Sequence, residues 1–224
     1  MPKNKKKNVW YKHIPAYIAR SVLPLLRLIF RTKIYFTKDC PRDIRKIKGG
    51  ALLISNHSNF SDPLIMTDVF WRRRLRYIVG ENIIDKEPRG TLLRGLGCVR
   101  VDRTSVDFDC VKASVSLLRE GELLTIYPEG GLNPHQTEIA EFKAGAALMA
   151  VIANVPIIPM YITPKKKALS SVRVIIGAPV DAVAICGRFP TAEGLDKLAK
   201  ELRSRVCNLK SELEGKKEKV SVEL

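Results

Sequence analysis

Residues 51–63 read ALLISNHSNFSDP, and this stretch decides how the chain is expected to fold. The apolar run Ala51–Ser55 has the length and composition of a buried strand. A polar turn follows, after which Asp62 suits a helix N-cap and Pro63 suits the first helical position. The stretch therefore predicts a strand, a short turn and a helix over 63–74, whose last turn carries three arginines that favour a helix C-terminus.

The rest of the chain after Cys40 repeats this alternation of short apolar runs and longer mixed segments. That pattern is typical of an α/β fold, in which a sheet is covered by helices. We take 51–55 as the first strand and expect a single domain with a mostly parallel or mixed sheet. Further strands are predicted at 75–79, 98–102, 123–127, 155–162 and 172–177, and further helices at 107–118, 141–153 and 192–214.

Three segments are expected along the chain. Residues 1–38 are basic and then apolar, and the run 22–29 is cut by Pro24 and Arg27, so it is too short to cross a bilayer. We predict an amphipathic helical segment that is retained and lies on a membrane surface, although a helix packed on the protein's own core has the same pattern. The domain spans 39–215, and 216–224 form a solvated tail.

The chain is strongly basic: 39 Lys and Arg against 23 Asp and Glu give a formal net charge of +16 over 224 residues. Such a surface attracts phosphates, nucleic acid or anionic lipid headgroups. A basic nucleic-acid-binding protein is the alternative from another class, but no helix-turn-helix, RNA-binding aromatic pair or zinc module is present in the sequence. We therefore expect an anionic membrane surface as a partner, and no nucleic acid.

The cysteines and histidines give no metal-binding pattern. Five cysteines are scattered and odd in number, and the three histidines stand far apart without ligand spacing. These observations predict no metal and a reducing, cytosolic setting.

His57 and Asp62 in the polar turn suggest acid–base chemistry. A neutral imidazole takes a proton from a hydroxyl near pH 7, and a carboxylate on its other ring nitrogen fixes the tautomer and stabilises the imidazolium. The end of a strand in an open α/β sheet is also where ligands usually bind. The alternative is structural: Asp62 only caps the helix and His57 is an ordinary loop residue.

Four short motifs, in order, resemble those of a known family. Asn56–Asp62 matches Asn-His, four residues, Asp; Gly97–Arg103 matches a glycine, a hydrophobic run and Asp-Arg; Tyr127–Gly130 resembles Phe-Pro-Glu-Gly; and Val155–Pro159 resembles the fourth motif. Together they are similar to the glycerolipid acyltransferases, the lysophospholipid acyltransferase family typified by 1-acylglycerol-3-phosphate acyltransferase. The resemblance covers roughly Ala51 to Val180.

The resemblance implies a membrane-associated enzyme of phospholipid biosynthesis. It implies that 39–215 form an acyltransferase domain, which moves a fatty acyl group from acyl-CoA or acyl carrier protein to the hydroxyl of a lysophospholipid such as 1-acylglycerol-3-phosphate. His57 is then the general base and Asp62 supports it. The acyl thioester is a substrate, so no cofactor is implied, and we expect the enzyme at the cytoplasmic face of a membrane.

The acceptor phosphate requires fixed cations. Arg103 at the end of a strand and Lys143 at the start of a helix are the candidates, within a substrate site that includes Glu129 and Gly130. Arg103 also suits a surface ion pair with Asp102 or Glu129. Backbone amides near Gly130 and Gly131 suit an oxyanion, although glycines in loops often serve turn geometry alone.

One residue departs from the family pattern. The third motif usually continues Glu-Gly-Thr-Arg, and its arginine is associated with the acceptor phosphate, whereas here Leu132 stands in its place. The exact acceptor therefore stays open between a phosphate-bearing lysolipid and another hydroxylated lipid. His135, just beyond, is a possible replacement or an exposed loop histidine.

Overall fold

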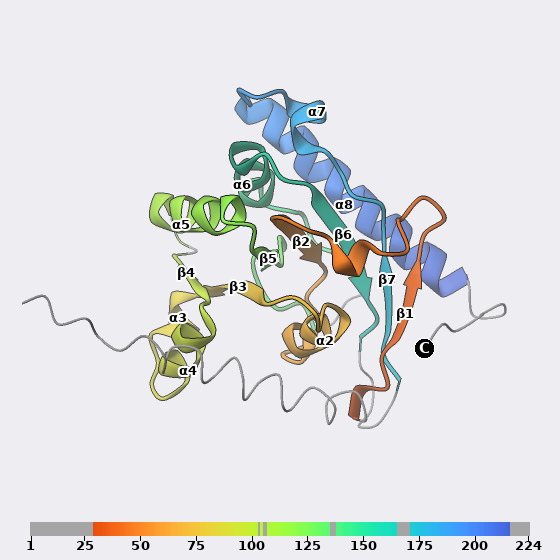
Figure 1. Ribbon diagram of the computed structural model, residues 1–224, viewed down its shortest axis with the longest axis horizontal. Coiled ribbons are helices and arrows are strands. Elements are labelled where there is room, and N and C mark those ends of the chain that lie inside the picture. Colours follow the sequence, from red (N-terminus) through yellow and green to blue (C-terminus); the bar gives the residue numbers. More distant parts are fainter. Residues whose placement is uncertain (1–28, 103, 105–106, 135–137, 165–170, 216–224) are drawn as a thin grey trace, which may run out of the picture.

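The computed structural model describes residues 29–102, 104, 107–134, 138–164 and 171–215. Its centre is a seven-stranded sheet with the order β1-β7-β6-β2-β5-β3-β4 (Figure 1). The strands are β1 (Lys33–Phe36), β2 (Ala51–Ser55), β3 (Leu75–Gly80), β4 (Val99–Val101), β5 (Leu123–Ile126), β6 (Ile157–Ile162) and β7 (Arg173–Ile176).

The sheet is mixed but mostly parallel, as the sequence predicts. Strands β2, β3, β4, β5 and β6 run the same way, because each pairs in parallel with its neighbour among them. β7 pairs antiparallel with β6, and β1 pairs in parallel with β7. The carboxyl ends of the five parallel strands therefore share one edge of the sheet, which is where the polar turn after β2 lies.

The strand β1 corrects two predictions. Residues 51–55 are not the first strand, and residues 33–36 belong to an edge strand of the sheet instead of a helical segment over 1–38. Residues 33–36 alternate Ile34 and Phe36 with Lys33 and Tyr35, but this short pattern lies within a longer basic and apolar segment and was not recognised as a strand. Pairing with β7 determines the extended conformation of these residues. Residues 1–28 and the predicted tail 216–224 lie outside the described part of the chain.

Helices cover both faces of the sheet (Figure 1). One face packs against α5 (Phe108–Arg119), α6 (Gly145–Ala153), α7 (Ala182–Cys186) and α8 (Ala192–Gly215). The other packs against α2 (Asp62–Val69) and the short 3-10 helix η2 (Ile44–Lys46). β2 is buried on both sides, since Leu52 and Ile54 belong to the first apolar cluster and Ala51 and Leu53 to the second. α3 (Glu81–Ile84) and α4 (Arg89–Leu96) flank β3 and β4.

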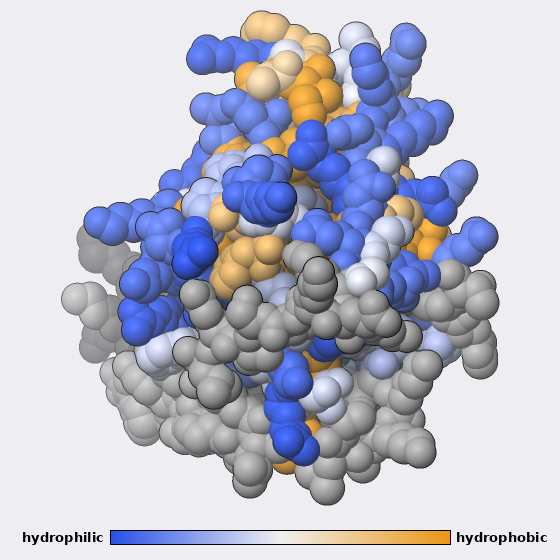
Figure 2. Space-filling view, turned by 90° about the vertical axis from the view of Figure 1, so that its right-hand side faces the viewer, coloured by the Kyte–Doolittle hydropathy of each residue, from blue (hydrophilic) through white to orange (hydrophobic). Residues whose placement is uncertain are grey.

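The long helix α8 uses its apolar stripe for the core. Leu198, Leu202, Val206, Leu209 and Leu213 are all buried against the sheet and its neighbouring helices. The three-and-four spacing of the leucines is thus the signature of core packing and not of a coiled coil. Figure 2 looks onto the right-hand side of the view in Figure 1, and hydrophilic residues make up most of its coloured surface, between smaller hydrophobic patches.

Two helix predictions need correction. α2 ends at Val69, so the arginines that follow do not form its last turn. Arg73 instead donates to the carbonyl oxygens of Ile47, Gly49 and Gly121, which ties the segment before β3 to two other loops. α6 begins at Gly145 and not at residue 141, because the preceding residues pair with the loop after β5.

Candidate active site

The polar turn after β2 is anchored by Asn56. Its side-chain oxygen accepts from the backbone N–H of Ile162 at 2.8 Å, and its side-chain nitrogen donates to the Ile162 carbonyl at 3.0 Å. Asn56 is fully buried, so both bonds are shielded from water. These two bonds hold the end of β2 against the end of β6 and thereby fix the backbone position from which His57 follows.

His57 and Asp62 are in contact, as the sequence predicts. Nδ1 of His57 lies 3.1 Å from Oδ2 of Asp62, and their side chains are 16% and 1% exposed. The same carboxylate oxygen accepts from the backbone N–H groups of Ser58 and Asn59, both at 2.8 Å. The carboxylate is therefore held at the centre of the turn by three polar contacts.

Asp62 does not cap the helix. The N-cap of α2 is Ser61, Asp62 is the first helical residue, and Pro63 follows as the second. Its carboxylate reaches back into the turn and not forward to the helix amides, so the predicted capping role is wrong. Because both Oδ2 amide bonds close the turn, Asp62 fixes the backbone that carries His57 as well as the imidazole itself.

The backbone of His57 is held on both sides by the loop after β5. Its N–H donates to Oε1 of Glu129 at 2.9 Å, and its carbonyl accepts from the N–H of Asn133 at 2.8 Å. Oε2 of Glu129 accepts from the Asn133 side chain at 3.1 Å. Glu129, predicted as a substrate contact, thus has a positioning role in the structure. Asn133 was missed, because no motif or spacing in the sequence points to it.

The imidazole stacks on Tyr127. The ring centroids lie 4.1 Å apart with an interplanar angle of 15°. The sheet register brings them together, because Ile54 of β2 pairs with Ile126 of β5. The Tyr127 hydroxyl is buried and has no hydrogen-bond partner among the described residues. Burial, followed by the nearby Tyr77 and Asp62, raises the pKa of Tyr127 well above its ordinary value.

Lys143 lies across Gly130. A Cβ on Gly130 would come within 2.7 Å of Cε of Lys143, and Gly130 has a φ of +75°, which favours glycine. The backbone N–H of Lys143 donates to the Pro128 carbonyl at 2.9 Å, two residues before α6 begins. No carboxylate in the described part of the chain forms an ion pair with the Lys143 ammonium, so this cation beside Gly130 suits an anionic ligand.

The amide of Gly130 is already used. Its N–H donates to the Tyr127 carbonyl at 3.0 Å in a tight turn. The predicted oxyanion role is therefore wrong for this amide, and Gly130 serves turn geometry together with close approach of Lys143. Arg103 and His135, two candidates from the sequence, lie outside the described residues.

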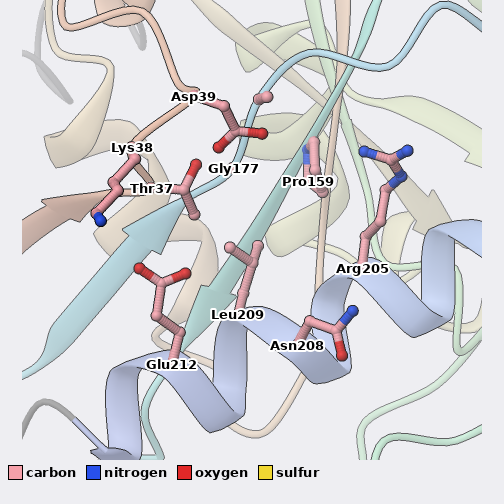
Figure 3. A pocket seen from close by; sticks show the side chains of 10 residues that line it. Thr37, Lys38, Asp39, Pro159, Gly177, Arg205, Asn208, Leu209 and Glu212 are labelled. Carbon is pink, nitrogen blue, oxygen red and sulfur yellow. The ribbon is translucent and has the colours of Figure 1, made fainter.

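A cleft elsewhere on the domain contains none of these residues. It has a volume of about 470 Å³ and lies between the segment after β1, the strands β6 and β7, and α8 (Figure 3). β1 runs opposite to β2, so the end of β1 is directed away from the edge that carries His57. Within the described ranges, no cluster of metal-ligating side chains occurs and no helix is long and apolar enough to span a bilayer.

Taken together, the turn presents a histidine whose Nδ1 is held by a buried carboxylate. This contact leaves the other ring nitrogen, Nε2, for proton exchange. The stacked Tyr127 and the clamped backbone limit how the ring can turn. Such an arrangement suits a general base that activates a hydroxyl next to a bound anion.

Comparisons with known proteins show the family to which the chain is similar. Residues 31–163 match the family described as Acyltransferase. The chain is 24% identical over 203 residues to the 1-acyl-sn-glycerol-3-phosphate acyltransferase of Bacillus subtilis (strain 168), covering 88% of this chain and 98% of that protein. It is 25% identical over 167 residues to the protein of the same name from Streptococcus pneumoniae (strain ATCC BAA-255 / R6), covering 72% and 61%.

A solved structure shares the fold. The 1-acyl-sn-glycerophosphate (LPA) acyltransferase PlsC from Thermotoga maritima superposes with a TM-score of 0.58 at 19% sequence identity, covering 94% of this chain and 84% of that chain. The α/β architecture with a mostly parallel sheet is thereby confirmed.

Proposed function

This chain belongs to the glycerolipid acyltransferase family, and on that premise we propose that it acylates 1-acylglycerol-3-phosphate in phospholipid synthesis. The acyl donor is a thioester of coenzyme A or of acyl carrier protein. The observation that carries the proposal is the 3.1 Å contact between His57 and the buried Asp62 at the end of β2. A thioester and a hydroxyl supply all the atoms of the reaction, so no cofactor is proposed.

His57 acts as the general base. Its Nε2 takes the proton of the acceptor hydroxyl while the oxygen attacks the thioester carbonyl, and Asp62 stabilises the imidazolium that forms. The tetrahedral intermediate then collapses with cleavage of the carbon–sulfur bond. The imidazolium returns its proton to the leaving thiolate, which restores the neutral histidine and yields an ester and a free thiol.

Lys143 supplies a charge for the acceptor phosphate. The two relatives named above act on 1-acyl-sn-glycerol-3-phosphate by their names, and its phosphate needs a cation beside the reacting hydroxyl. Lys143, which lies against Gly130, can supply this cation. Leu132 stands where the family motif usually has an arginine, so that position provides no charge. Arg103 remains the second candidate on sequence grounds. An acceptor without phosphate is the alternative for this same site.

The catalytic edge of the domain faces a membrane in our proposal. Phe60 and Leu64 are 79% and 44% exposed and lie in the turn and in the first turn of α2, three and seven positions after His57. β1 begins at this same edge, because it runs opposite to β2, so the basic N-terminal segment joins the domain there. We propose that this edge binds the anionic lipids of a membrane's cytoplasmic face. Vesicle binding that changed neither with salt concentration nor with the content of anionic lipid would contradict this proposal.

An acidic carrier protein needs exposed cations to dock, and the arginines between 72 and 76 are candidates. Of the arginines between 72 and 76, Arg73 and Arg74 donate to backbone carbonyls and Arg76 pairs with Glu122. Arg72 is exposed, with its guanidinium 5.0 Å from the centroid of the Trp71 ring. We therefore propose Arg72 as the docking cation of this group. The lysine run 165–167 also suits such docking by its sequence, but it lies outside the described residues.

The proposal is tested with the purified full chain. Radiolabelled acyl-CoA and acyl carrier protein thioesters are each supplied with lysophosphatidic acid, with other lysophospholipids and with a monoacylglycerol that lacks phosphate. We expect a diacylated phosphate product from lysophosphatidic acid and less product from the phosphate-free acceptor. Absence of transfer from both donors to every acceptor would refute the function, and equal transfer to all acceptors would refute the phosphate specificity.

A further inference from the structure

We infer that Arg203, on the carboxyl-terminal helix α8, is a positioning residue for His57, an inference that rests on the proposed function of His57. Arg203 acts through one peptide group and one carboxylate, and it touches neither His57 nor the substrate site. It lies beyond residues 31–163, the part of the chain that matches the acyltransferase family. The family motifs therefore give no role to this residue.

Arg203 grips the Ile139–Ala140 segment. Its Nη2 donates to the Ile139 carbonyl at 2.6 Å, and its Nε donates to the carbonyls of Ile139 and Ala140 at 3.0 and 3.1 Å. No carboxylate among the described residues pairs with this guanidinium. The guanidinium is planar and its N–H donors have a rigid arrangement. Hydrogen bonds from it to two carbonyls of one distant loop therefore fix both the position and the orientation of that loop.

The peptide unit between Ile139 and Ala140 connects Arg203 to Glu129. The Ile139 carbonyl and the Ala140 N–H belong to the same peptide unit, and that N–H donates to Oε2 of Glu129 at 3.0 Å. The unit thus lies between a cation at its oxygen end and a carboxylate at its nitrogen end. Both partners strengthen its dipole in the same sense, so the two bonds reinforce each other.

Glu129 completes the connection to the catalytic turn. Its other oxygen, Oε1, accepts from the His57 N–H at 2.9 Å. Asn133 adds a parallel link, because its side chain donates to Oε2 of Glu129 and to the Glu138 carbonyl, while its backbone N–H donates to the His57 carbonyl. The loop that Arg203 holds therefore sets both backbone contacts of the proposed general base.

The expected consequence is a loss of rate without a comparable loss of binding. A misplacement of about 1 Å at a catalytic group can cost roughly 100-fold in rate. Without the guanidinium, the Ile139 carbonyl loses its cation and Glu129 is held less tightly, so His57 samples unproductive positions. Acyl-donor binding uses other groups and should change little.

The test compares Arg203→Ala and Arg203→Lys with Arg205→Ala in the full chain. Arg205 lies on the same helix, is 40% exposed and pairs with Glu201 within the helix, so its loss controls for removing a charge from α8. We expect Arg203→Ala to lower kcat by about 10- to 100-fold with KM for the acyl donor within about twofold. Arg203→Lys should retain part of the rate, and added guanidinium ion should partly restore Arg203→Ala.

A second readout does not depend on activity. The backbone amide resonances of Ala140 and His57 should move in Arg203→Ala and stay in place in Arg205→Ala, because the bonds made by these N–H groups weaken. If wild type shows no transferase activity, the proposed function fails while the amide shifts still report on the connection. If wild type is active and Arg203→Ala matches Arg205→Ala in kcat and in both amide shifts, the inference is wrong. If Arg203→Ala does not fold, the same comparison with Arg203→Lys decides.

Discussion

Oδ2 of Asp62 lies 3.1 Å from Nδ1 of His57 while it also accepts two backbone amides of the turn between them. One buried oxygen therefore organises both the ring and the loop that carries it. The rest of the site builds on this contact: Tyr127 supports the face of the ring, and Glu129 and Asn133 hold the backbone.

Asp62→Asn should separate charge from shape. The amide oxygen can still accept from the turn, but no negative charge remains to stabilise the imidazolium. We expect kcat to fall by about 100- to 10,000-fold and the free energy of unfolding to fall by about 1–3 kcal/mol. Initial rates and urea denaturation measure the two effects. Asp109→Asn, at an exposed position of α5, is the control, and a kcat for Asp62→Asn within twofold of it would contradict the role of the carboxylate.

Tyr127→Phe should keep the activity and improve stability. The ring that stacks on His57 remains, while a buried hydroxyl without a partner is removed. We expect kcat within about twofold of wild type and a free energy of unfolding higher by about 1 kcal/mol. Tyr127→Ala should instead lower both quantities. A large loss of kcat in Tyr127→Phe would show that the hydroxyl takes part in the reaction.

Lys143→Ala should affect acceptors according to their charge. A charge-assisted bond to phosphate contributes about 1.5–3 kcal/mol, so KM for lysophosphatidic acid should rise at least about tenfold. KM for a phosphate-free acceptor should not change. Lys112→Ala removes an exposed lysine from α5 and serves as the control. A parallel rise of KM for both acceptors would instead indicate that Lys143 supports the loop at Gly130.

Buried thiols should make the protein less stable at alkaline pH. Burial raises the pKa of Cys98 and Cys110 from 9.0 to about 11. Between these values the unfolded chain loses thiol protons that the folded chain keeps, so the unfolded state binds fewer protons and stability falls as pH rises. Urea denaturation from pH 8 to 11 should show this decline, and it should be smaller in Cys98→Ala/Cys110→Ala. Equal slopes in both proteins would exclude the thiols as its cause.

The sequence predicts elements whose signal is local. The buried strand β2 and the amphipathic α8 depend on residues within a few positions, and the structure confirms both. The N-cap of α5 is equally local, since Asp107 accepts from the Cys110 N–H. The contact of His57 with Asp62 is local as well, since five positions separate them.

Other parts of the fold and site depend on contacts between distant residues. The arginines after α2 look like a helix end, yet Arg73 bonds with loops 24 to 48 positions away. Glu129 meets His57 across 72 positions, and Arg203 meets Ile139 across 64. The partner of a side chain at such a separation is set by the packing of the sheet and its helices, and no spacing rule in one sequence encodes it.

The role of His57 as general base is the central claim, and the rate of acyl transfer by His57→Ala tests it most directly. The variant and wild type are compared with the same radiolabelled acyl thioester and lysophosphatidic acid, after circular dichroism and thermal melting establish that both are folded. Because general-base catalysis contributes about 100- to 10,000-fold, we predict a loss of product formation within that range. Product formation by His57→Ala equal to that of wild type would contradict the account.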